Sequence, residues 1–219
     1  MDSVYYKEVK TAFNDWAATY EEDVVPKLIQ RGYSYAELGK YIAGYIELVD
    51  AAKPDVLELG TGTGILGINV VTNAVRPVNL TGLDIADEML KKASEKKIYQ
   101  DLICSSADLY EFQKKFDIIY SGFMFHSVMD QRLLIDRISH SLNLGGYFLM
   151  IDLIPNETVQ GHNCDYNSHS RAYEHGAPSN YKSNRELINL FNHCELQLVR
   201  VEQLGIDKDY NHFLYVLKK

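Results

Sequence analysis

Cysteine is scarce in this chain of 219 residues, and the three that occur, Cys104, Cys164 and Cys194, lie far apart. An odd number of scattered cysteines without a C-x-x-C pair argues against a disulfide framework and favours a reducing compartment. We therefore expect a cytoplasmic protein. His169 and His175 follow Cys164, but this spacing matches no familiar zinc site, so we expect no metal.

Long apolar runs and a surplus of basic residues are also missing. The N-terminus has neither the basic start nor the apolar core of a signal peptide, and no apolar run is long enough to span a bilayer. Lys and Arg number 22 against 30 Asp and Glu, which gives a formal net charge of −8. Because nucleic acids are bound by clustered basic residues, we expect no nucleic-acid partner and no membrane partner.

What the sequence does contain is a glycine-rich turn. A short apolar run, 56–59, is followed by Gly60, Gly62 and Gly64 and then by residues that can form a helix. This pattern predicts a strand, a tight turn and a helix. Glycine is needed where φ is positive or where a ligand comes too close for a Cβ. Asp84 ends the next apolar run, where a carboxylate can accept hydrogen bonds from both ribose hydroxyls, so we expect an adenosine-bearing cofactor.

The charge beside this turn separates two classes of cofactor. A dinucleotide brings a pyrophosphate, which favours bare N–H groups and the spacing G-x-G-x-x-G. Here the spacing is G-x-G-x-G, and Glu58 stands two residues before the first glycine. A carboxylate at this place repels a pyrophosphate and suits the cationic S-adenosylmethionine. The motif resembles the first motif of class I S-adenosylmethionine-dependent methyltransferases, E/D-x-G-x-G-x-G.

The resemblance implies an α/β, Rossmann-like class I methyltransferase fold. Its seven-stranded, mainly parallel sheet has the strand order 3-2-1-4-5-7-6 with an antiparallel last strand. Short apolar runs that alternate with helical segments from Pro54 onward independently indicate a parallel sheet. We expect one domain, 1–219, made of a helical cap (1–50), a cofactor-binding core (51–153), a substrate lid (154–182) and a C-terminal helix with a strand hairpin (183–219).

Other patterns predict where helices begin and end. Ser34 with Glu37 and Ser183 with Glu186 have the spacing of a capping box. A further helix is expected from about residue 130 to 142, closed by a pair of glycines. The large residues of the segment 10–25 recur at helical spacing, which predicts one helix with a shared face: Phe13, Trp16, Tyr20 and Val24.

The resemblance also implies which residues bind the cofactor. The segment around Tyr20 is similar to one that caps the cofactor in the family, so its hydroxyl is expected at the methionine carboxylate. Asp108 is expected to accept from the adenine amino group, and the N–H of Leu109 to meet a ring nitrogen. Ala86 replaces a serine usual in the family, which removes a helix cap. The complete set is Tyr20, Glu58, Gly60, Thr61, Gly62, Gly64, Asp84, Ile85, Met89, Ala107, Asp108, Leu109, Ser121 and Gly122.

Candidate catalytic residues follow the fourth expected strand and lie in the polar stretch after the fifth. His126 could take a proton from an incoming hydroxyl or amine, although it could also only hydrogen-bond its loop into shape. Long loops in compact domains are often lids, so Tyr166, His169 and Tyr173 are further candidates.

The reaction expected from the resemblance is methyl transfer from S-adenosylmethionine to an oxygen, nitrogen or carbon of a small molecule, with S-adenosylhomocysteine as the product. Two alternatives stay open, an NAD(P)-dependent oxidoreductase and a non-catalytic S-adenosylmethionine-binding protein. The sequence leaves the acceptor and the oligomeric state undetermined.

Overall fold

A seven-stranded sheet forms the centre of the computed structural model, which describes residues 3–155, 172–174, 177–206 and 209–219. The strands of this sheet are β1 (Asp55–Leu59), β2 (Asn79–Asp84), β3 (Asp101–Cys104), β4 (Phe116–Gly122), β5 (Leu142–Pro155), β8 (Gln197–Ile206) and β9 (Tyr210–Lys218). Two short strands, β6 (Ala172–Glu174) and β7 (Ala177–Ser179), pair with each other in a separate hairpin.

The strand order of the main sheet is β3-β2-β1-β4-β5-β9-β8. The pairs from β3 through β5 are parallel, whereas β9 is antiparallel to both β5 and β8. When the separate hairpin is left out of the count, this is the predicted order 3-2-1-4-5-7-6 with an antiparallel last strand. The predicted fold is therefore confirmed, and the reversal of strand order beside β1 creates the usual binding crevice of an open α/β sheet.

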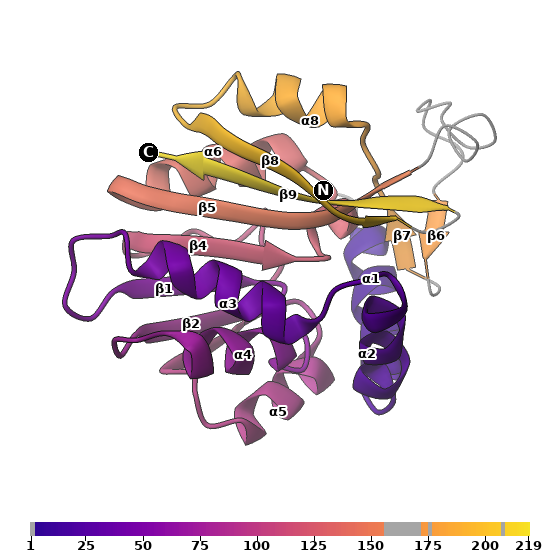
Figure 1. Ribbon diagram of the computed structural model, residues 1–219. Coiled ribbons are helices and arrows are strands. Elements are labelled where there is room, and N and C mark those ends of the chain that lie inside the picture. The colour runs from indigo at the N-terminus through magenta and orange to yellow at the C-terminus, as the bar shows by residue number, and fades with distance from the viewer. Residues whose placement is uncertain (1–2, 156–171, 175–176, 207–208) are drawn as a thin grey trace.

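Helices cover both faces of the sheet (Figure 1). On one face α3 and α4 pack on the strands, and on the other face α6 and α8 do so. Ile118 and Ile119 are consecutive in β4, are both fully buried and belong to opposite layers. A central parallel strand is apolar on both sides because each side has its own layer of helices. The helices are α1 (Ser3–Trp16), α2 (Tyr20–Gln30), α3 (Tyr35–Ile46), α4 (Ile65–Asn73), α5 (Asp87–Glu95), α6 (Gln131–Ser141) and α8 (Asn184–Phe191), with a 3-10 turn at Phe125–Ser127.

The predicted helix starts are confirmed at both serines. The Ser34 side chain accepts a hydrogen bond from the N–H of Glu37, and Ser183 forms a complete capping box with Glu186. None of the helices in the described ranges is both long and apolar enough to cross a bilayer.

Two helix boundaries differ from the prediction. The single helix expected over 10–25 is wrong, because the chain breaks after Trp16 and resumes with Tyr20 as the first residue of α2. The predicted aromatic face survives this break, since the rings of Trp16 and Tyr20 meet edge to face at 4.7 Å. The glycine cap is also wrong, because α6 ends at Ser141 and Gly145 and Gly146 lie within β5.

The first helix is fastened to the start of α5. Ala86 stands at the N-cap of α5 and offers no side-chain cap, as the sequence predicts. Asn14 supplies the acceptor instead, because its Oδ1 accepts from the N–H of Glu88 at 3.0 Å. Lys10 adds an ion pair with Asp87 at 2.6 Å. Figure 1 shows the result, with α1 and α2 beside the end of the sheet toward which β4 points.

Candidate functional site

A first pocket lies where the carboxyl ends of the strands meet α1. Its walls come from α1, the start of α2, the glycine turn after β1, the end of β2, the first turn of α5 and the loops after β3 and β4. The lining residues are Tyr6, Val9, Phe13, Tyr20, Gly60, Gly62, Leu83, Asp84, Ile85, Met89, Ser106, Ala107, Gly122, Phe123, Met124, Ser127 and Val128.

The glycine turn has the left-handed backbone that its sequence predicts. Gly60, Gly62 and Gly64 have φ values of 70°, 54° and 80°, in the left-handed region that favours glycine. A Cβ on Gly62 would meet no atom within 4 Å, so the space beside it is open toward the pocket. The turn therefore presents bare backbone to whatever binds here.

Asp84 is fixed at the pocket by two backbone donors. Its Oδ2 accepts from the N–H of Gly62 at 2.7 Å, and its Oδ1 accepts from the N–H of Ala86 at 2.8 Å. Burial raises the pKa of this carboxyl, and the hydrogen bonds from Ala86 and Gly62 oppose the rise. The carboxylate is thus oriented in advance, with its remaining lone pairs available to a ligand in the pocket.

Glu58 lies behind the turn and does not line the pocket. Its side chain is only 2% exposed, and its Oε2 accepts a hydrogen bond from the Tyr99 hydroxyl at 2.5 Å. Burial raises the pKa of Glu58 to about 8, although the hydrogen bond from Tyr99 lowers it. At pH 7 the carboxyl is therefore mostly protonated. This corrects the expectation of a fixed negative charge at the turn, because the sequence does not reveal that Tyr99 seals the side chain from water.

The raised pKa of Glu58 gives a prediction about stability. Since burial raises it from an ordinary value of 4.5 to about 8, the folded protein keeps a proton that the unfolded chain has released between these pH values. The free energy of unfolding should fall from about pH 5 to about pH 8, by a few kcal/mol at about 1.4 kcal/mol per pKa unit. Glu58→Gln retains an acceptor for Tyr99 and does not titrate, so urea unfolding of this variant should vary less with pH. Identical pH dependence in the two proteins would contradict the prediction.

The predicted cofactor residues divide into two groups in the structure. Eight of them line the first pocket: Tyr20, Gly60, Gly62, Asp84, Ile85, Met89, Ala107 and Gly122. The others lie outside its lining and around it: Glu58, Thr61, Gly64, Asp108, Leu109 and Ser121. Thr61 is buried and donates from its hydroxyl to the Glu58 carbonyl at 3.3 Å, which supports the turn from within.

Asp108 is fully buried and has donors of its own. The Tyr6 hydroxyl donates to its Oδ2 at 2.8 Å, the N–H of Asp130 donates to the same oxygen at 3.0 Å, and the Ser106 hydroxyl donates to Oδ1. The N–H of Leu109 donates to the Ser106 carbonyl at 3.2 Å. The contacts of Asp108 and Leu109 with an adenine therefore stay predictions, while Ser106 and Ala107 provide the pocket wall at this place.

A second pocket adjoins the first. The two share Phe13, Tyr20, Phe123 and Ser127, which we call the junction. The second pocket has a volume of about 220 Å³ and is lined by Phe13, Trp16, Tyr20, Val24, Lys27, Arg31, Tyr35, Phe123, His126, Ser127 and Leu153. A small molecule held here would lie next to whatever fills the first pocket.

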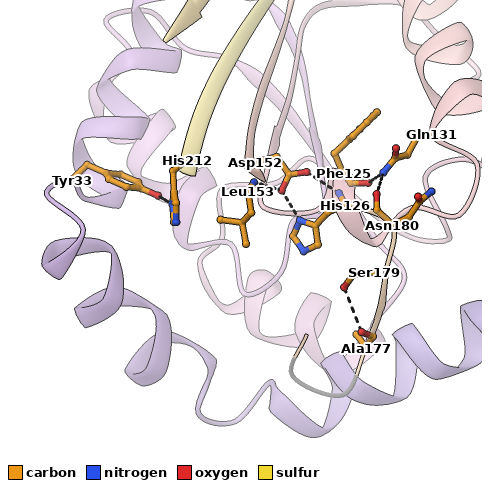
Figure 2. Close-up of polar contacts among 10 residues, drawn as sticks. All are labelled: Tyr33, Phe125, His126, Gln131, Asp152, Leu153, Ala177, Ser179, Asn180 and His212. Carbon is orange, nitrogen blue, oxygen red and sulfur yellow. Dashed lines mark hydrogen bonds and ion pairs between the residues drawn. The ribbon is translucent and has the colours of Figure 1, made fainter. Parts of the chain in front are cut away.

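His126 lies in the wall of the second pocket and is held by Asp152 of β5. Its Nδ1 is 2.5 Å from the Asp152 Oδ1, and its backbone N–H donates to Oδ2 at 2.7 Å (Figure 2). The N–H of Leu153 also donates to Oδ1 at 2.8 Å. The two side chains are 6% and 3% exposed. A buried aspartate that grips the histidine through both ring and backbone fixes the direction of the imidazole.

The end of the predicted lid packs against this histidine. Tyr181 stacks on the His126 ring at 4.9 Å between centroids, and the N–H of Asn180 donates to the His126 carbonyl at 2.5 Å. Of the other catalytic candidates, Tyr166 and His169 lie outside the described residues, and Tyr173 is placed in β6 by its backbone. In the ranges that the structure describes, no group of three or more metal-binding side chains occurs.

Several lining residues were not predicted. Phe123 is a non-glycine residue with φ of 57° at the junction, and its N–H donates to the Ile151 carbonyl at 2.8 Å. A bulky residue in this conformation is strained, and such strain is concentrated at functional sites. Tyr6 and Val9 are missed because α1 begins earlier than the helical pattern suggested. Asp152 carries no local signal that ties it to His126, because their contact is made between different strands and loops.

Known proteins resemble this chain in sequence and in structure. A family model described as a methyltransferase domain matches residues 28–201. Malonyl-(acyl-carrier protein) O-methyltransferase 2 of Ilyobacter polytropus is 32% identical over 146 residues, which cover 65% of this chain and 52% of that protein. Carboxy-S-adenosyl-L-methionine synthase of Helicobacter pylori is 29% identical over 151 residues, covering 66% of this chain and 63% of its own length. The chain thus spans between about half and two thirds of these curated relatives.

The fold is also found in solved structures. The crystal structure of an S-adenosylmethionine-dependent methyltransferase from Clostridium acetobutylicum has a TM-score of 0.68 with 18% identity, and the match covers 94% of this chain and 98% of that one. At this level of identity the likeness concerns the fold alone.

Proposed function

This chain belongs to the methyltransferase domain family, and we propose that it transfers a methyl group from S-adenosylmethionine to a nucleophilic oxygen, nitrogen or carbon of a small molecule. Because the chain belongs to this family, we do not retain the NAD(P)-dependent oxidoreductase as an alternative. The observation that carries the proposal is the Asp84 carboxylate, held by the N–H groups of Gly62 and Ala86 beside a turn of bare backbone. This arrangement suits the ribose of an adenosine-bearing cofactor, and family membership favours S-adenosylmethionine as that cofactor.

The first pocket is proposed to hold the cofactor, and its residues divide the work. Asp84 binds the ribose hydroxyls, Ile85 and Met89 form apolar walls, and Ser106 and Ala107 border the adenine. Tyr20 lies at the junction and is proposed to reach the methionine part, as the sequence predicts. The cofactor supplies an activated methyl group, so the protein must mainly orient the two reactants and exclude water.

His126 is proposed to receive the proton when the acceptor is a hydroxyl or an amine. Because Asp152 engages Nδ1, the proton would go to Nε2, and the resulting imidazolium would be stabilised by the aspartate. Ser127, the next residue, lies at the junction between the two pockets, which supports a methyl transfer close to His126. Tyr166, His169 and Tyr173 stay candidates for contacts with the acceptor.

The organisation and location of the protein are proposed from the same pattern. Residues 1–50 cap the crevice, 51–153 bind the cofactor, 154–182 close over the acceptor and 183–219 complete the sheet. The acidic balance supports a small-molecule partner over a nucleic acid. The scarcity of cysteine supports a cytoplasmic location.

Calorimetry with two cofactor classes tests the proposed function. S-adenosylhomocysteine is expected to bind the purified protein with one site, and NAD is expected to give no saturable heat at the same concentrations. Tritiated methyl groups from S-adenosylmethionine should then appear in small molecules of a metabolite extract. Tight cofactor binding without any labelled product would indicate the non-catalytic alternative, and NAD binding would contradict the proposal.

A further inference from the structure

The second pocket carries positive charge in an acidic protein. Its described lining includes two cations, Lys27 and Arg31, and no aspartate or glutamate, while the chain as a whole has a net charge of −8. Both cations are half-buried. A pocket with this balance attracts an anion, because partly buried charges interact more strongly than charges in open water.

The two cations lie together on one side of α2. They are four residues apart, at the last turn and at the C-cap of the helix, so they project toward the same region. The Lys27 ammonium lies 6.0 Å from the centre of the Trp16 ring and forms no ion pair in the described part of the chain. The arginine guanidinium is a planar fork of N–H donors, and the lysine ammonium is a compact positive charge. Both groups bind the oxygens of a carboxylate or a phosphate.

The remaining walls of this pocket are mostly apolar. The apolar part comes from α1, α2, α3, β5 and the loop after β4, while Tyr20, His126 and Ser127 are the other polar members of the lining. The apolar residues are Phe13, Trp16, Val24, Tyr35, Phe123 and Leu153. A ligand with only charged groups would leave these walls without a partner. The lining therefore suits an organic anion with an aromatic or aliphatic body.

The position of the cations along α2 sets the orientation of such a ligand. Tyr20 lies at the junction, and Lys27 and Arg31 follow it by seven and eleven residues, which corresponds to a rise of about 10 and about 16 Å along the helix. Ser127 is one of the junction residues, and His126, which precedes it in the sequence, lines the second pocket. The anion would bind at the end of the pocket away from the cofactor, and another group of the ligand would face the methyl donor.

We propose that the methyl acceptor is a small organic anion with an apolar body, whose carboxylate or phosphate is bound by Lys27 and Arg31 while its methyl-accepting group lies at the junction. This inference rests on the proposed function, because it assigns the substrate class of the same site. Lys27 and Arg31 anchor the acceptor and take no part in the chemical step.

The only tryptophan of the chain provides the probe. Trp16 lies in the wall of the second pocket, so its fluorescence reports ligands that bind there. The protein saturated with S-adenosylhomocysteine is titrated with phenylpropanoate, with its neutral amide phenylpropanamide, with the cation phenylpropylamine, and with phenylethyl phosphate. We expect saturable binding of the carboxylate or the phosphate, weaker binding of the amide and none of the amine. The tighter of the two acids identifies the anion.

Charge removal at the two cations completes the experiment. The double variant Lys27→Gln with Arg31→Gln should bind the preferred anion at least about tenfold more weakly, since each charge-assisted hydrogen bond contributes substantially, and should bind the amide as before. Lys40→Gln, which removes an exposed cation of α3 outside the pocket, should behave as the wild type. S-adenosylhomocysteine binding is measured by calorimetry for every variant. It should not change, because neither cation lines the first pocket.

The outcomes separate the two levels of the proposal. If the wild-type protein does not bind S-adenosylhomocysteine, the proposed function is refuted. Three results would overturn the anion site alone, provided that S-adenosylhomocysteine binds normally. They are a preference for the amide or the amine over the acids, a lack of saturable acid binding, and an unchanged anion affinity in the double variant.

Discussion

Asp84→Ala is expected to weaken S-adenosylhomocysteine binding by about a hundredfold or more, measured by calorimetry. The carboxylate would make two hydrogen bonds to the ribose, and hydrogen bonds to a charged group contribute about 1.5–3 kcal/mol each. The substitution also leaves the N–H groups of Gly62 and Ala86 without their acceptor, which loosens the turn that borders the cofactor.

The control for this prediction is Glu95→Gln, which removes an exposed carboxylate at the end of α5 and should leave the affinity unchanged. Because burial raises the pKa of Asp84, this carboxylate takes up a proton at a higher pH than an exposed aspartate does. As the pH is lowered, the affinity of the wild type for S-adenosylhomocysteine should therefore begin to decline at that higher pH. Wild-type affinity in Asp84→Ala, with an intact fold by circular dichroism, would refute the assignment of the ribose site.

His126→Gln is expected to lower the rate of methyl transfer by about 10²- to 10⁴-fold, the usual contribution of a general base. The affinity for S-adenosylhomocysteine should not change, since His126 lines the second pocket and not the first. A general base must be unprotonated, so the wild-type rate should fall as the pH is lowered, and the variant should lose this dependence. The measurement is the incorporation of tritiated methyl groups into extract metabolites at saturating cofactor.

Two further variants distinguish a base from a residue that only shapes its loop. Asp152→Asn should lower the rate while retaining cofactor binding, because the amide no longer stabilises an imidazolium. His140→Gln alters an exposed histidine of α6, whose ring contacts the Asp136 carbonyl, and should leave the rate unchanged. A His126→Gln protein with the wild-type rate and pH profile would show that the histidine has a structural role only.

The sheet and its binding edge could be predicted from sequence because their signals are local. Apolar runs separated by helical segments define the strands, and the spacing of the three glycines with Asp84 defines the turn that we propose binds the cofactor. The structure adds the physical reason for that spacing. The N–H of Gly62 is the donor that holds Asp84, so the glycine and the aspartate form one unit across two strands.

The rest of the site depends on contacts that no local pattern records. Tyr99 lies 41 residues from the Glu58 that it seals, and Asp152 lies 26 residues from the His126 that it orients. The break between α1 and α2 is equally hidden, since Phe13, Trp16, Tyr20 and Val24 fit one continuous helix in sequence. Whether an ionisable side chain is charged in a folded protein depends on its burial, and burial is a property of the whole fold.

The fastening of α1 to α5 bears on how ligands would enter and leave the two pockets. The helix covers the first pocket through Tyr6 and Val9, and its Phe13 belongs to both pockets. Its ties to α5 are an ion pair between partly exposed side chains, with 42% and 55% exposure, and two hydrogen bonds of Asn14, one to Asp87 and one from Glu88. An exposed ion pair contributes at most about 1 kcal/mol, so the helix is held mainly by the buried Tyr5 and Val9 and by the hydrogen bond from the Tyr6 hydroxyl to Asp108. A movement of α1 that breaks these contacts would open both pockets together, so we expect this helix to control the exchange of both ligands.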